Sequence, residues 1–454
     1  MSCRLGAAVS AAVLVLGVGL ARAQTTGGST YPIDLPATLR LAGAQNLDIQ
    51  IAREALKEAQ ARRVSALEQF FPWLAPGITY NRRDGLAQAV PAGTISETHF
   101  QSYAPGATVV AQVALGDAIY NALAAKQLSR AAGEALEAQR QDSTLSAAHA
   151  YFDLTKAKAL VEVARQAWET SQDYQHQLHE AVTVGIAFKG DELRVQTQTE
   201  LYQIAERQAL ERQRVTAANL ARLLHLDPAV ELVAQDNGLT PVTLFEADAP
   251  LETLVQQALR LRPELKQSQA LVSAAQDETS GTLYGPLIPS IGARVFAGGL
   301  GGGHDNQPSN FGASEDYLIG LGWRIGPGGL LDFGRIDASK ARLAATQLGD
   351  AKLKDTITAQ VVESLTRVQS LSDQIALAQR NLVTADETLR LTRARKQYGV
   401  GIVLEDIQAQ QALDQARADC FTTIAEFNKA QYGLNKAVGG PLEPEQRQEF
   451  QPLH

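Results

Sequence analysis

Two pairs of adjacent carboxylates stand out as residues of this chain that could act on ions. Asp191 and Glu192 follow one glycine-containing break, and Glu405 and Asp406 follow a second one. Each pair falls in the first turn of an expected helix, where a negative charge is stabilised by the positive end of the helix dipole. Stabilising the helix is the simplest role for these carboxylates, and attracting cations is the chemical role that we consider beside it.

Other patterns that could carry chemistry are incomplete. His176 and His179 are three positions apart and could share a helix face, but no third metal ligand is evident. The glycine-rich stretch Gly298–Gly303 lacks the Lys-Ser/Thr pair that completes a phosphate-binding loop. The sequence also contains no nucleophile elbow and no HExxH motif. We therefore expect no enzyme, no metal site and no cofactor, and a periplasmic hydrolase would lack a catalytic site.

Two long rods dominate the expected secondary structure. Asp117–Val184 has no proline, is rich in good helix formers and carries apolar residues at helical spacing. As one helix, its roughly 67 residues would be about 100 Å long. Asp332–Tyr398 predicts a second rod. Two shorter helices follow the breaks, one from Asp191 or Glu192 to Leu226 and one over Glu405–Val438. A single globular domain does not need rods of this length, so part of the molecule must span a distance.

Ahead of each rod the hydrophobic period changes to two, which predicts a β-hairpin. Pro76–Leu86 and Ala104–Leu115 form the first predicted hairpin, and Ser290–Ala297 and Tyr317–Ile325 form the second. Glycine, proline and small polar residues predict a long loop within each hairpin. The expected loops are Asp84–Pro105 and Gly298–Ser314.

The order of these elements repeats along the chain. A helix over Leu35–Phe71 is expected before the first hairpin, and one over Leu251–Tyr284 before the second. These two helices start 216 positions apart, and Gly185 and Gly399 are 214 positions apart. Nearly constant offsets predict a tandem duplication. The predicted organisation is a signal peptide at 1–23, a first repeat at 24–226 with a hairpin at about 76–115, a linker or equatorial segment at 227–250, a second repeat at 251–439 with a hairpin at about 290–325, and a C-terminal tail at 440–454.

The first residues predict export from the cytoplasm. Arg4 precedes the apolar stretch Gly6–Leu20, and Ala21–Ala23 fits a signal-peptidase site. Beyond this stretch the sequence has no run of about 20 apolar residues that would predict a transmembrane helix. Cys420 is the one cysteine after the predicted signal, so no intrachain disulfide is expected. A net charge of −8 argues against nucleic acid as a partner.

Each half of the chain supplies only two expected strands, so the chain cannot close a barrel by itself. An open four-stranded sheet leaves two edges whose backbone groups have no partners. Alternating strands with aromatic residues such as Tyr80, Tyr317 and Trp323 near their ends are typical of transmembrane β-barrels. We predict a mixed α and β fold, in which a long α-helical coiled-coil barrel is fused to a transmembrane β-barrel shared by several chains.

Several segments, taken in their order, resemble the TolC-type outer-membrane efflux protein family, and the resemblance covers nearly the whole mature chain. It implies a homotrimer with four strands per chain, hence a 12-stranded barrel continued by a helical tunnel. It also implies passive export across the outer membrane of a Gram-negative bacterium, with a long periplasmic extension. The segments are Leu47–Ala52, Phe71-Pro72, Leu220–Asp227, Leu331–Arg335, Gly399–Gly401 and Leu404–Gln410.

The resemblance implies partners as well as a fold. An inner-membrane pump would supply the energy, a periplasmic adaptor protein would join pump and duct, and outer-membrane lipid would surround the barrel. In the family, acidic rings narrow the periplasmic end of the tunnel. The family's acidic tip position falls on Glu405 and, in the first copy, on Asp191, with Asp406 and Glu192 beside them. Where some members carry a second aspartate one turn further on, this chain has Gln408.

The two breaks are candidate contacts for the adaptor, because exposed apolar residues beside flexible glycines mark an interaction surface. A plain helix-to-helix turn is the simpler interpretation of the same residues. A second departure from the family pattern is His225, where the family often has a glycine that Gly439 retains in the second copy. The candidate contacts are Val184, Gly185, Ile186, Val400, Gly401 and Ile402.

One alternative function belongs to a different class. A non-channel coiled-coil structural protein of the cell envelope would also contain two long rods. Such a scaffold would not need four alternating segments placed as two hairpins between its rods, so the export duct is the function that the sequence favours.

Overall fold

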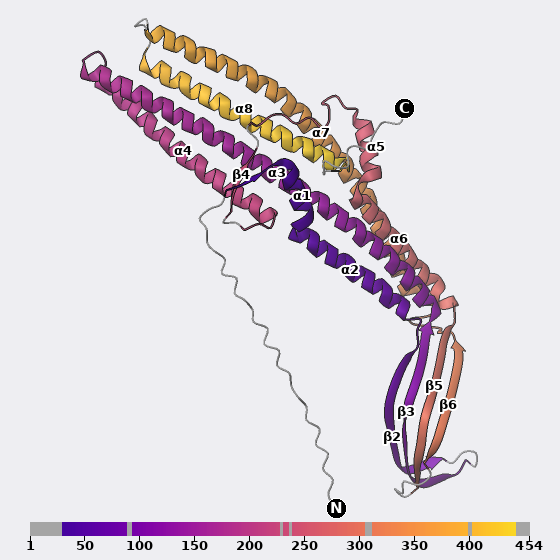
Figure 1. Ribbon diagram of the computed structural model, residues 1–454. Helices are drawn as coiled ribbons and strands as arrows, with labels where there is room; N and C mark the ends of the chain where they lie inside the picture. Colours follow the sequence, from indigo (N-terminus) through magenta and orange to yellow (C-terminus); the bar gives the residue numbers. More distant parts are fainter. Residues whose placement is uncertain are drawn as a thin grey trace, which may run out of the picture.

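The computed structural model describes residues 30–88, 93–227, 230–235, 238–304, 311–397 and 402–441. The predicted signal peptide at 1–23 lies outside these residues, as do Val400, Gly401 and nearly all of the predicted tail at 440–454. The described part is elongated, and a helical rod continues at one end into a narrow sheet (Figure 1).

Two helical hairpins form the end of the rod that lies far from the sheet (Figure 1). The first consists of α3 (Leu115–Thr183) and α4 (Lys189–Leu223), and the second of α7 (Phe333–Gln397) and α8 (Val403–Ala437). α3 is an uninterrupted helix of 69 residues, which corresponds to roughly 100 Å. Both rods predicted from the sequence are confirmed.

The helices that precede the strands are broken, although the sequence predicted one continuous helix in each case. The first is divided into α1 (Leu35–Gln45) and α2 (Leu47–Glu68), and the second into α5 (Leu251–Leu261) and α6 (Pro263–Tyr284). α2 and α6 contact the half of α3 that is nearer to the sheet (Figure 1).

Each break has a local cause that overrides the helical period. Asn46 is extended (φ −61°, ψ 131°), and its side chain accepts a 2.8 Å hydrogen bond from the N–H of Asp48, which caps α2. Pro263 excludes Arg262 from the helical conformation. The buried guanidinium of Arg262 donates to the carboxylate of Glu264, with the shorter of the two bonds at 2.9 Å.

Four antiparallel strands form one sheet in the order β2-β3-β5-β6. The strands are β2 (Trp73–Gln88), β3 (Ile95–Ala114), β5 (Ser290–His304) and β6 (Gly312–Gly322). The short 3₁₀ turn η1 (Gly285–Leu287) lies between α6 and β5. Among the residues that the structure describes, β2 and β6 each pair with one strand only, so they are the edges of the sheet.

Both expected loops turn out to contain strand, which corrects the sequence prediction. β2 pairs with β3 along the full length of β2, so most of Asp84–Pro105 belongs to the hairpin ladder. Gly298–His304 continues β5. The aromatic rings of Tyr103 and Phe311 stack at 5.9 Å, and a Cβ at Gly301 would lie 2.6 Å from the Tyr103 ring. Glycine is therefore used in this strand to make room for aromatic side chains.

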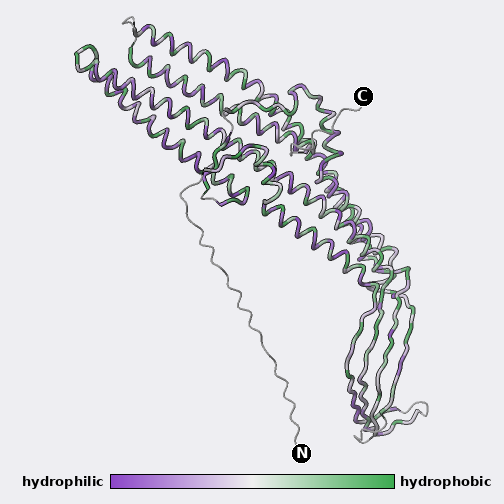
Figure 2. Tube along the Cα trace, in the orientation of Figure 1, coloured by the Kyte–Doolittle hydropathy of each residue, from purple (hydrophilic) through white to green (hydrophobic). Residues whose placement is uncertain are grey.

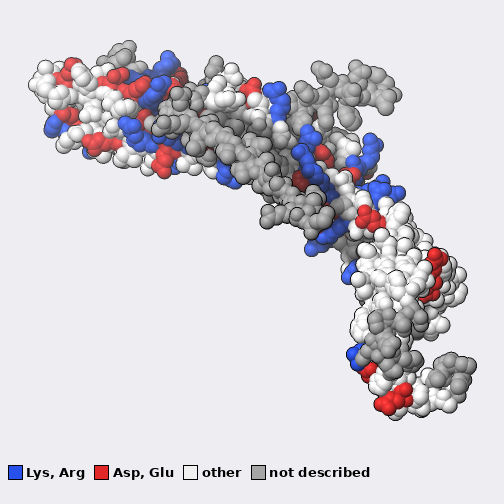
Figure 3. Space-filling view, turned by 60° about the horizontal axis from the view of Figure 1, so that its bottom comes forward, with Lys and Arg blue, Asp and Glu red and all other residues white. Residues whose placement is uncertain are grey.

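The ladder register separates an apolar face of the sheet from a more polar one. Because side chains alternate between faces, Leu74, Val109, Val295 and Tyr317 form one row on the apolar face across all four strands. Hydrophobic residues recur along these strands, and few charges appear on the sheet in the space-filling view (Figures 2 and 3). The opposite face includes Thr79, Asn81, Ser102, Thr108, Arg294 and Asp316.

Of the helices in the described ranges, none combines the length and the apolar character that crossing a membrane would require.

The segment between the two halves crosses the middle of the rod. Here β1 (Thr30–Ile33) pairs in parallel with β4 (Glu231–Ala234), a strand within the segment 227–250 that the sequence predicts to be a linker. Buried side chains of α8 hold the following segment in place. Asn428 accepts a hydrogen bond from the N–H of Val242 at 2.7 Å, and Gln431 accepts one from the N–H of Phe245 at 2.9 Å. These amides satisfy an extended backbone that has no ladder of its own.

His225 ends α4 in a conformation that usually requires glycine. Its φ is +56°, and the N–H of Leu226 bonds to the carbonyl of Ala221 at 2.9 Å, as in a Schellman cap. Gly439 (φ +75°) occupies the equivalent place after α8, where the N–H of Gly440 bonds to the carbonyl of Asn435. The chain therefore places a β-carbon in the left-handed region at one of two matching caps.

We predict that His225→Gly stabilises the protein. The exposed imidazole makes no hydrogen bond among the described residues, so the substitution should remove backbone strain of about 1 kcal/mol. Thermal unfolding followed by circular dichroism should show a higher midpoint. Gly439→Ala is the matched opposite change and should lower the unfolding midpoint, because a Cβ there would lie 3.0 Å from the backbone nitrogen of Arg262. An unchanged or lower midpoint for His225→Gly would contradict the argument.

Candidate functional site at the helical tips

The turn between α3 and α4 exposes apolar side chains at the far end of the rod. Gly185 has φ +78°, and the N–H of Ile186 bonds to the carbonyl of Ala181 at 2.8 Å, so α3 also ends in a Schellman cap. Val184 is exposed, and Ile186 and Phe188 are each 82% exposed. The sequence analysis did not include Phe188, although an aromatic residue just before a helix start was a usable signal.

The turn between α7 and α8 shows a similar apolar character at its described end. Ile402 and Leu404 flank the start of α8, and both are exposed. The other two predicted tip residues, Val400 and Gly401, lie outside the described residues. Both hairpins thus present unpartnered apolar side chains near their ends.

Two of the four predicted carboxylates are buried within their hairpins. Glu192 is 8% exposed at its side chain, and its Oε1 lies 2.7 Å from Lys189 Nζ and 2.9 Å from His179 Nδ1. The hydrogen bond from Lys189, followed by the one from His179, holds the pKa of Glu192 below its usual value. Asp406 is also 8% exposed at its side chain, with Arg393 Nε at 3.6 Å from its Oδ1.

The other two predicted carboxylates are more accessible. The side chain of Glu405 is 40% exposed, with Arg395 Nη1 at 3.6 Å from its Oε2. The side chain of Asp191 is 26% exposed and accepts a 3.2 Å hydrogen bond from Arg194. Each of these partners is also a surface residue of the same hairpin, so the ion pairs are weak and leave the carboxylates able to face solvent.

The phenol of Tyr174 on α3 is influenced by one carboxylate from each of the two predicted acidic pairs. Burial raises the pKa of its phenol, and the negative charges of Asp406 and Asp191 raise it further. The phenol therefore stays protonated, and a carboxylate from each hairpin acts on the same side chain.

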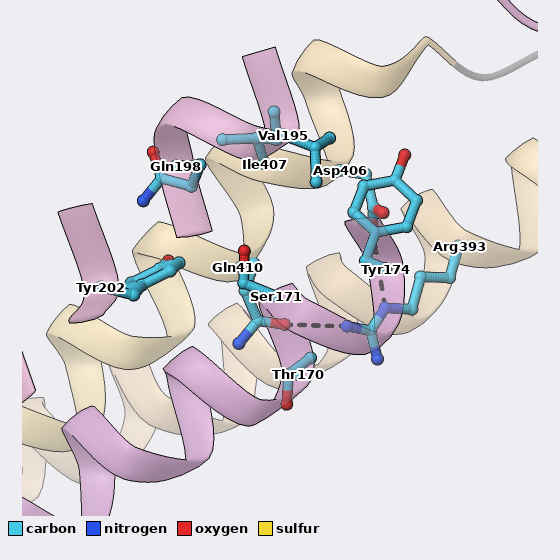
Figure 4. Close-up of a pocket in the computed structure, with 10 residues that line it drawn as sticks. All are labelled: Thr170, Ser171, Tyr174, Val195, Gln198, Tyr202, Arg393, Asp406, Ile407 and Gln410. Atoms are coloured by element: carbon cyan, nitrogen blue, oxygen red, sulfur yellow. Dashed lines mark hydrogen bonds and ion pairs between the residues drawn. The ribbon is translucent and has the colours of Figure 1, made fainter. Parts of the chain in front are cut away.

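A small cavity beside Tyr174 lies between the two hairpins (Figure 4). Its volume is about 20 Å³, enough for one water molecule. Arg393 reaches across the cavity and donates a 2.8 Å hydrogen bond to Gln410 Oε1. The lining residues are Thr170, Ser171 and Tyr174 of α3, Val195, Gln198 and Tyr202 of α4, Arg393 of α7, and Asp406, Ile407 and Gln410 of α8.

Two of the residues that line this cavity, Gln198 and Tyr202, also join α4 to α8 by direct hydrogen bonds. The hydroxyl of Tyr202 donates to Asp414 Oδ2 at 3.0 Å, and Gln411 donates to Gln198 at 2.8 Å. Burial raises the pKa of Asp414, and the bonds from Gln410 and Tyr202 only partly oppose this effect. The sequence analysis missed this contact, because Tyr202 and Asp414 are 212 positions apart.

The histidines considered as metal ligands have other partners. His179 pairs with Glu192, and His176 Nδ1 lies 3.6 Å from Glu180 Oε1. Within the described ranges, no group of three or more His, Cys, Asp or Glu residues is arranged to hold a metal ion.

Residues 254–440 match the family model described as outer membrane efflux protein. This segment is therefore similar to outer membrane efflux proteins. It runs from within α5 to the end of α8, and over it the predicted resemblance to TolC-type proteins is confirmed.

Solved structures extend the likeness to the fold of the whole chain. A membrane protein from Pseudomonas aeruginosa is similar over 90% of this chain and 91% of its own, with a TM-score of 0.78 at 18% identity. The Campylobacter jejuni CmeC outer membrane channel is similar over 89% of this chain and 85% of its own, with a TM-score of 0.76 at 16% identity. The chain therefore shares the fold of these two structures over about nine tenths of its length.

A curated relative matches over a shorter range. Nodulation protein T from Rhizobium leguminosarum bv. trifolii is 26% identical over 241 residues, which are 51% of this chain and 49% of that protein. The chain thus spans about half the length of this relative.

We predict that Asp414→Asn stabilises the protein increasingly as pH rises. Because the folded state raises the pKa of Asp414 above its usual value of 3.8, the folded state binds its proton more tightly than the unfolded state does. The aspartate's contribution therefore falls as pH rises through the folded pKa, whereas the asparagine amide keeps both neighbours and has no charge.

The measurement is the difference in thermal midpoint between Asp414→Asn and the parent protein from pH 4 to pH 8. This difference should grow in favour of the variant. Asp419→Asn on the exposed side of α8 is the control and should show no such trend. A difference that is constant with pH would show that Asp414 is charged without cost in the folded state.

Proposed function

We propose that three copies of this chain form an export duct in the outer membrane of a Gram-negative bacterium. The sheets would close a 12-stranded barrel, and the helical hairpins would continue it as a tunnel through the periplasm. A periplasmic adaptor and an inner-membrane pump would deliver the substrates, and the duct itself would need no catalytic site.

The observation that carries this proposal is the sheet with an apolar face and two unpaired edges. β2 and β6 leave one side of their backbones without hydrogen-bond partners among the described residues. In lipid such groups are satisfied only when a sheet closes on itself. One chain supplies four strands, so closure needs several chains, and the polar face would then line the interior.

The helices support the same assembly. α4 and α7 carry large hydrophobic side chains that are exposed in the single chain, and partner helices would cover them. On α4 these are Leu193, Leu201, Ile204 and Val215, and on α7 they are Leu348, Leu377, Val383 and Leu391.

The tips would carry the contacts and the gate. We propose that Val184, Gly185, Ile186, Val400, Gly401 and Ile402, together with the exposed Phe188, contact the adaptor. Among the acidic residues, Glu405 and Asp191 are the more exposed and would form the rings that narrow the tunnel. Asp406 and Glu192 are buried and ion-paired, so they would hold the hairpin ends in position.

We also propose that the chain arose by tandem duplication, with the two repeats at 24–226 and 251–439. The lengths of matching helices support this origin. α1 and α5 each have 11 residues, α2 and α6 each have 22, and α4 and α8 each have 35.

The assembly is tested with the full chain purified from membranes in mild detergent. A duct should run as a trimer on denaturing gels without boiling, run as a monomer after boiling, and conduct ions in planar bilayers. A coiled-coil scaffold of the cell envelope would give no conductance. A stable monomer without conductance would overturn the proposed function.

The proposed gate is tested by Glu405→Ala. Removing three carboxylates from a narrow opening should lower the preference for cations over anions, measured as a shift of the reversal potential in a salt gradient. Glu54→Ala on α2 removes an exposed carboxylate far from the tips and should leave the reversal potential unchanged. Unchanged selectivity in Glu405→Ala would remove this residue from the gate.

A further inference from the structure

A carboxylate lies on the apolar face of the sheet. Glu315 of β6 shares this face with Tyr317, and its ladder row continues through Ala297, Ala107 and Pro76. The hydroxyl of Tyr317 donates a 2.8 Å hydrogen bond to Glu315 Oε2. Within the described part of the chain, no lysine or arginine forms an ion pair with this carboxylate. A charge on a membrane-facing surface is costly unless it is paired, so Glu315 requires a cation from elsewhere.

The opposite edge of the sheet carries the complementary charge. Arg82 and Arg83 are adjacent and exposed on β2, whereas Glu315 and Asp316 are adjacent and exposed on β6. Arg82 pairs with Asp84 at 2.7 Å, and Arg83 has no ion pair among the described residues. The two unpaired edges of one chain therefore have opposite signs.

We propose that β6 of one chain pairs with β2 of a second copy in the register that places Glu315 opposite the partner's Arg82. This inference rests on the proposed function, because it defines how the copies join to close the barrel. Asp316 then lies diagonal to the partner's Arg83 on the polar face, within reach of a long side chain. Each junction between copies thus contains a charge pair on both faces of the sheet.

The same register matches the uncharged residues along the two edges. Aromatic, β-branched and glycine residues each meet their own kind, and such cross-strand pairs stabilise antiparallel sheets. The matched pairs are Tyr317 with the partner's Tyr80, Ile319 with the partner's Ile78, and Gly320 with the partner's Gly77.

Neighbouring registers fit less well. A shift by one residue would turn the apolar face of one chain toward the polar face of the next. A shift by two in one direction places Glu315 opposite the partner's Tyr80 and leaves the carboxylate without a direct cation. A shift by two in the other direction places it opposite the partner's Asp84, and like charges facing each other are destabilising.

The proposed register also agrees with the geometry of closed barrels. The ladder places Trp73 of β2 and Leu318 of β6 in one row, and in the proposed register Leu318 meets the partner's Thr79. A row followed across the four strands of one chain therefore meets β2 of the next copy about six residues further along that strand. For twelve strands this stagger corresponds to a tilt of the strands of about 45° from the barrel axis. Transmembrane barrels have tilts of about 35–45°.

Disulfide trapping tests the register directly. Glu315→Cys and Arg82→Cys are combined in a Cys420→Ala background, so that only the two introduced thiols remain in the mature full-length chain. β3 and β5 separate the two edges within one chain, so a disulfide must join different copies. We expect a covalent trimer that survives boiling and disappears on reduction. Glu315→Cys with Tyr80→Cys is the off-register control, and a trimer from this pair in place of the first would overturn the register.

A double-mutant cycle tests the ion pair itself. Glu315→Gln and Arg82→Gln are each expected to lower the temperature at which the unboiled trimer dissociates by several degrees, and the double variant should fall by less than the sum of the two shifts. Additive shifts would overturn the ion pair. A parent protein that forms no heat-sensitive trimer would contradict the proposed function. A trimer that forms but shows additive shifts would contradict only the ion pair, so the two failures are distinguishable.

Discussion

The constraint on which this structure depends is the hydrogen-bonding requirement of backbone groups in lipid. A helix satisfies that requirement within itself, whereas a sheet satisfies it only by closing. Among the described residues, β2 and β6 end the sheet of one chain with unpaired edges, and the row through Val109 and Val295 makes one face of this sheet apolar. In the proposed duct the number of strands in one chain therefore sets the number of chains, and the helical part would share the symmetry of the sheet because α3 follows β3 without a linker.

The helical part solves a different problem, since its backbone is already satisfied and only its side chains need partners. The core of the described residues lies where the two halves meet in the middle of the rod, around residues such as Tyr151, Leu220 and Leu434. Buried amides and ion pairs are concentrated at this level, including Asn46, Arg262, Asn428 and Gln431. These polar groups are paired, so they fix the positions at which helices bend and at which the crossing segment docks, as an apolar core alone would not.

Sequence reasoning succeeded where one periodic signal extends over many residues. The proline-free stretch before Val184 predicted α3 almost to the residue, and the change of period at Pro76 and Ser290 located both hairpins. It failed where a single side chain overrides the period, as Asn46 does by capping α2, and where a distant partner decides the outcome, as β2 does for the glycine-containing part of the hairpin.

Two further features could not be predicted from local sequence, because they also depend on distant partners. β4 has four residues and is a strand only because β1 lies beside it. The Tyr202–Asp414 bond joins positions that no local pattern relates, although an aspartate among the apolar residues of α8 was a signal that could have been followed. By contrast, the acidic residues at the helix starts were found because charge at a helix N-terminus is a local feature.

The continuity of α3 has a mechanical consequence. Between the core residue Tyr151 and its end at Thr183 no cap, proline or glycine interrupts the helix, so this segment acts as a stiff lever of roughly 50 Å. A swing of about 10° around the level of Tyr151 would carry the tip about 9 Å sideways, since the displacement scales with the arm length of a helix that rises about 1.5 Å per residue. Small adjustments in the packing around Tyr151 are thus converted into large displacements of the helical tip.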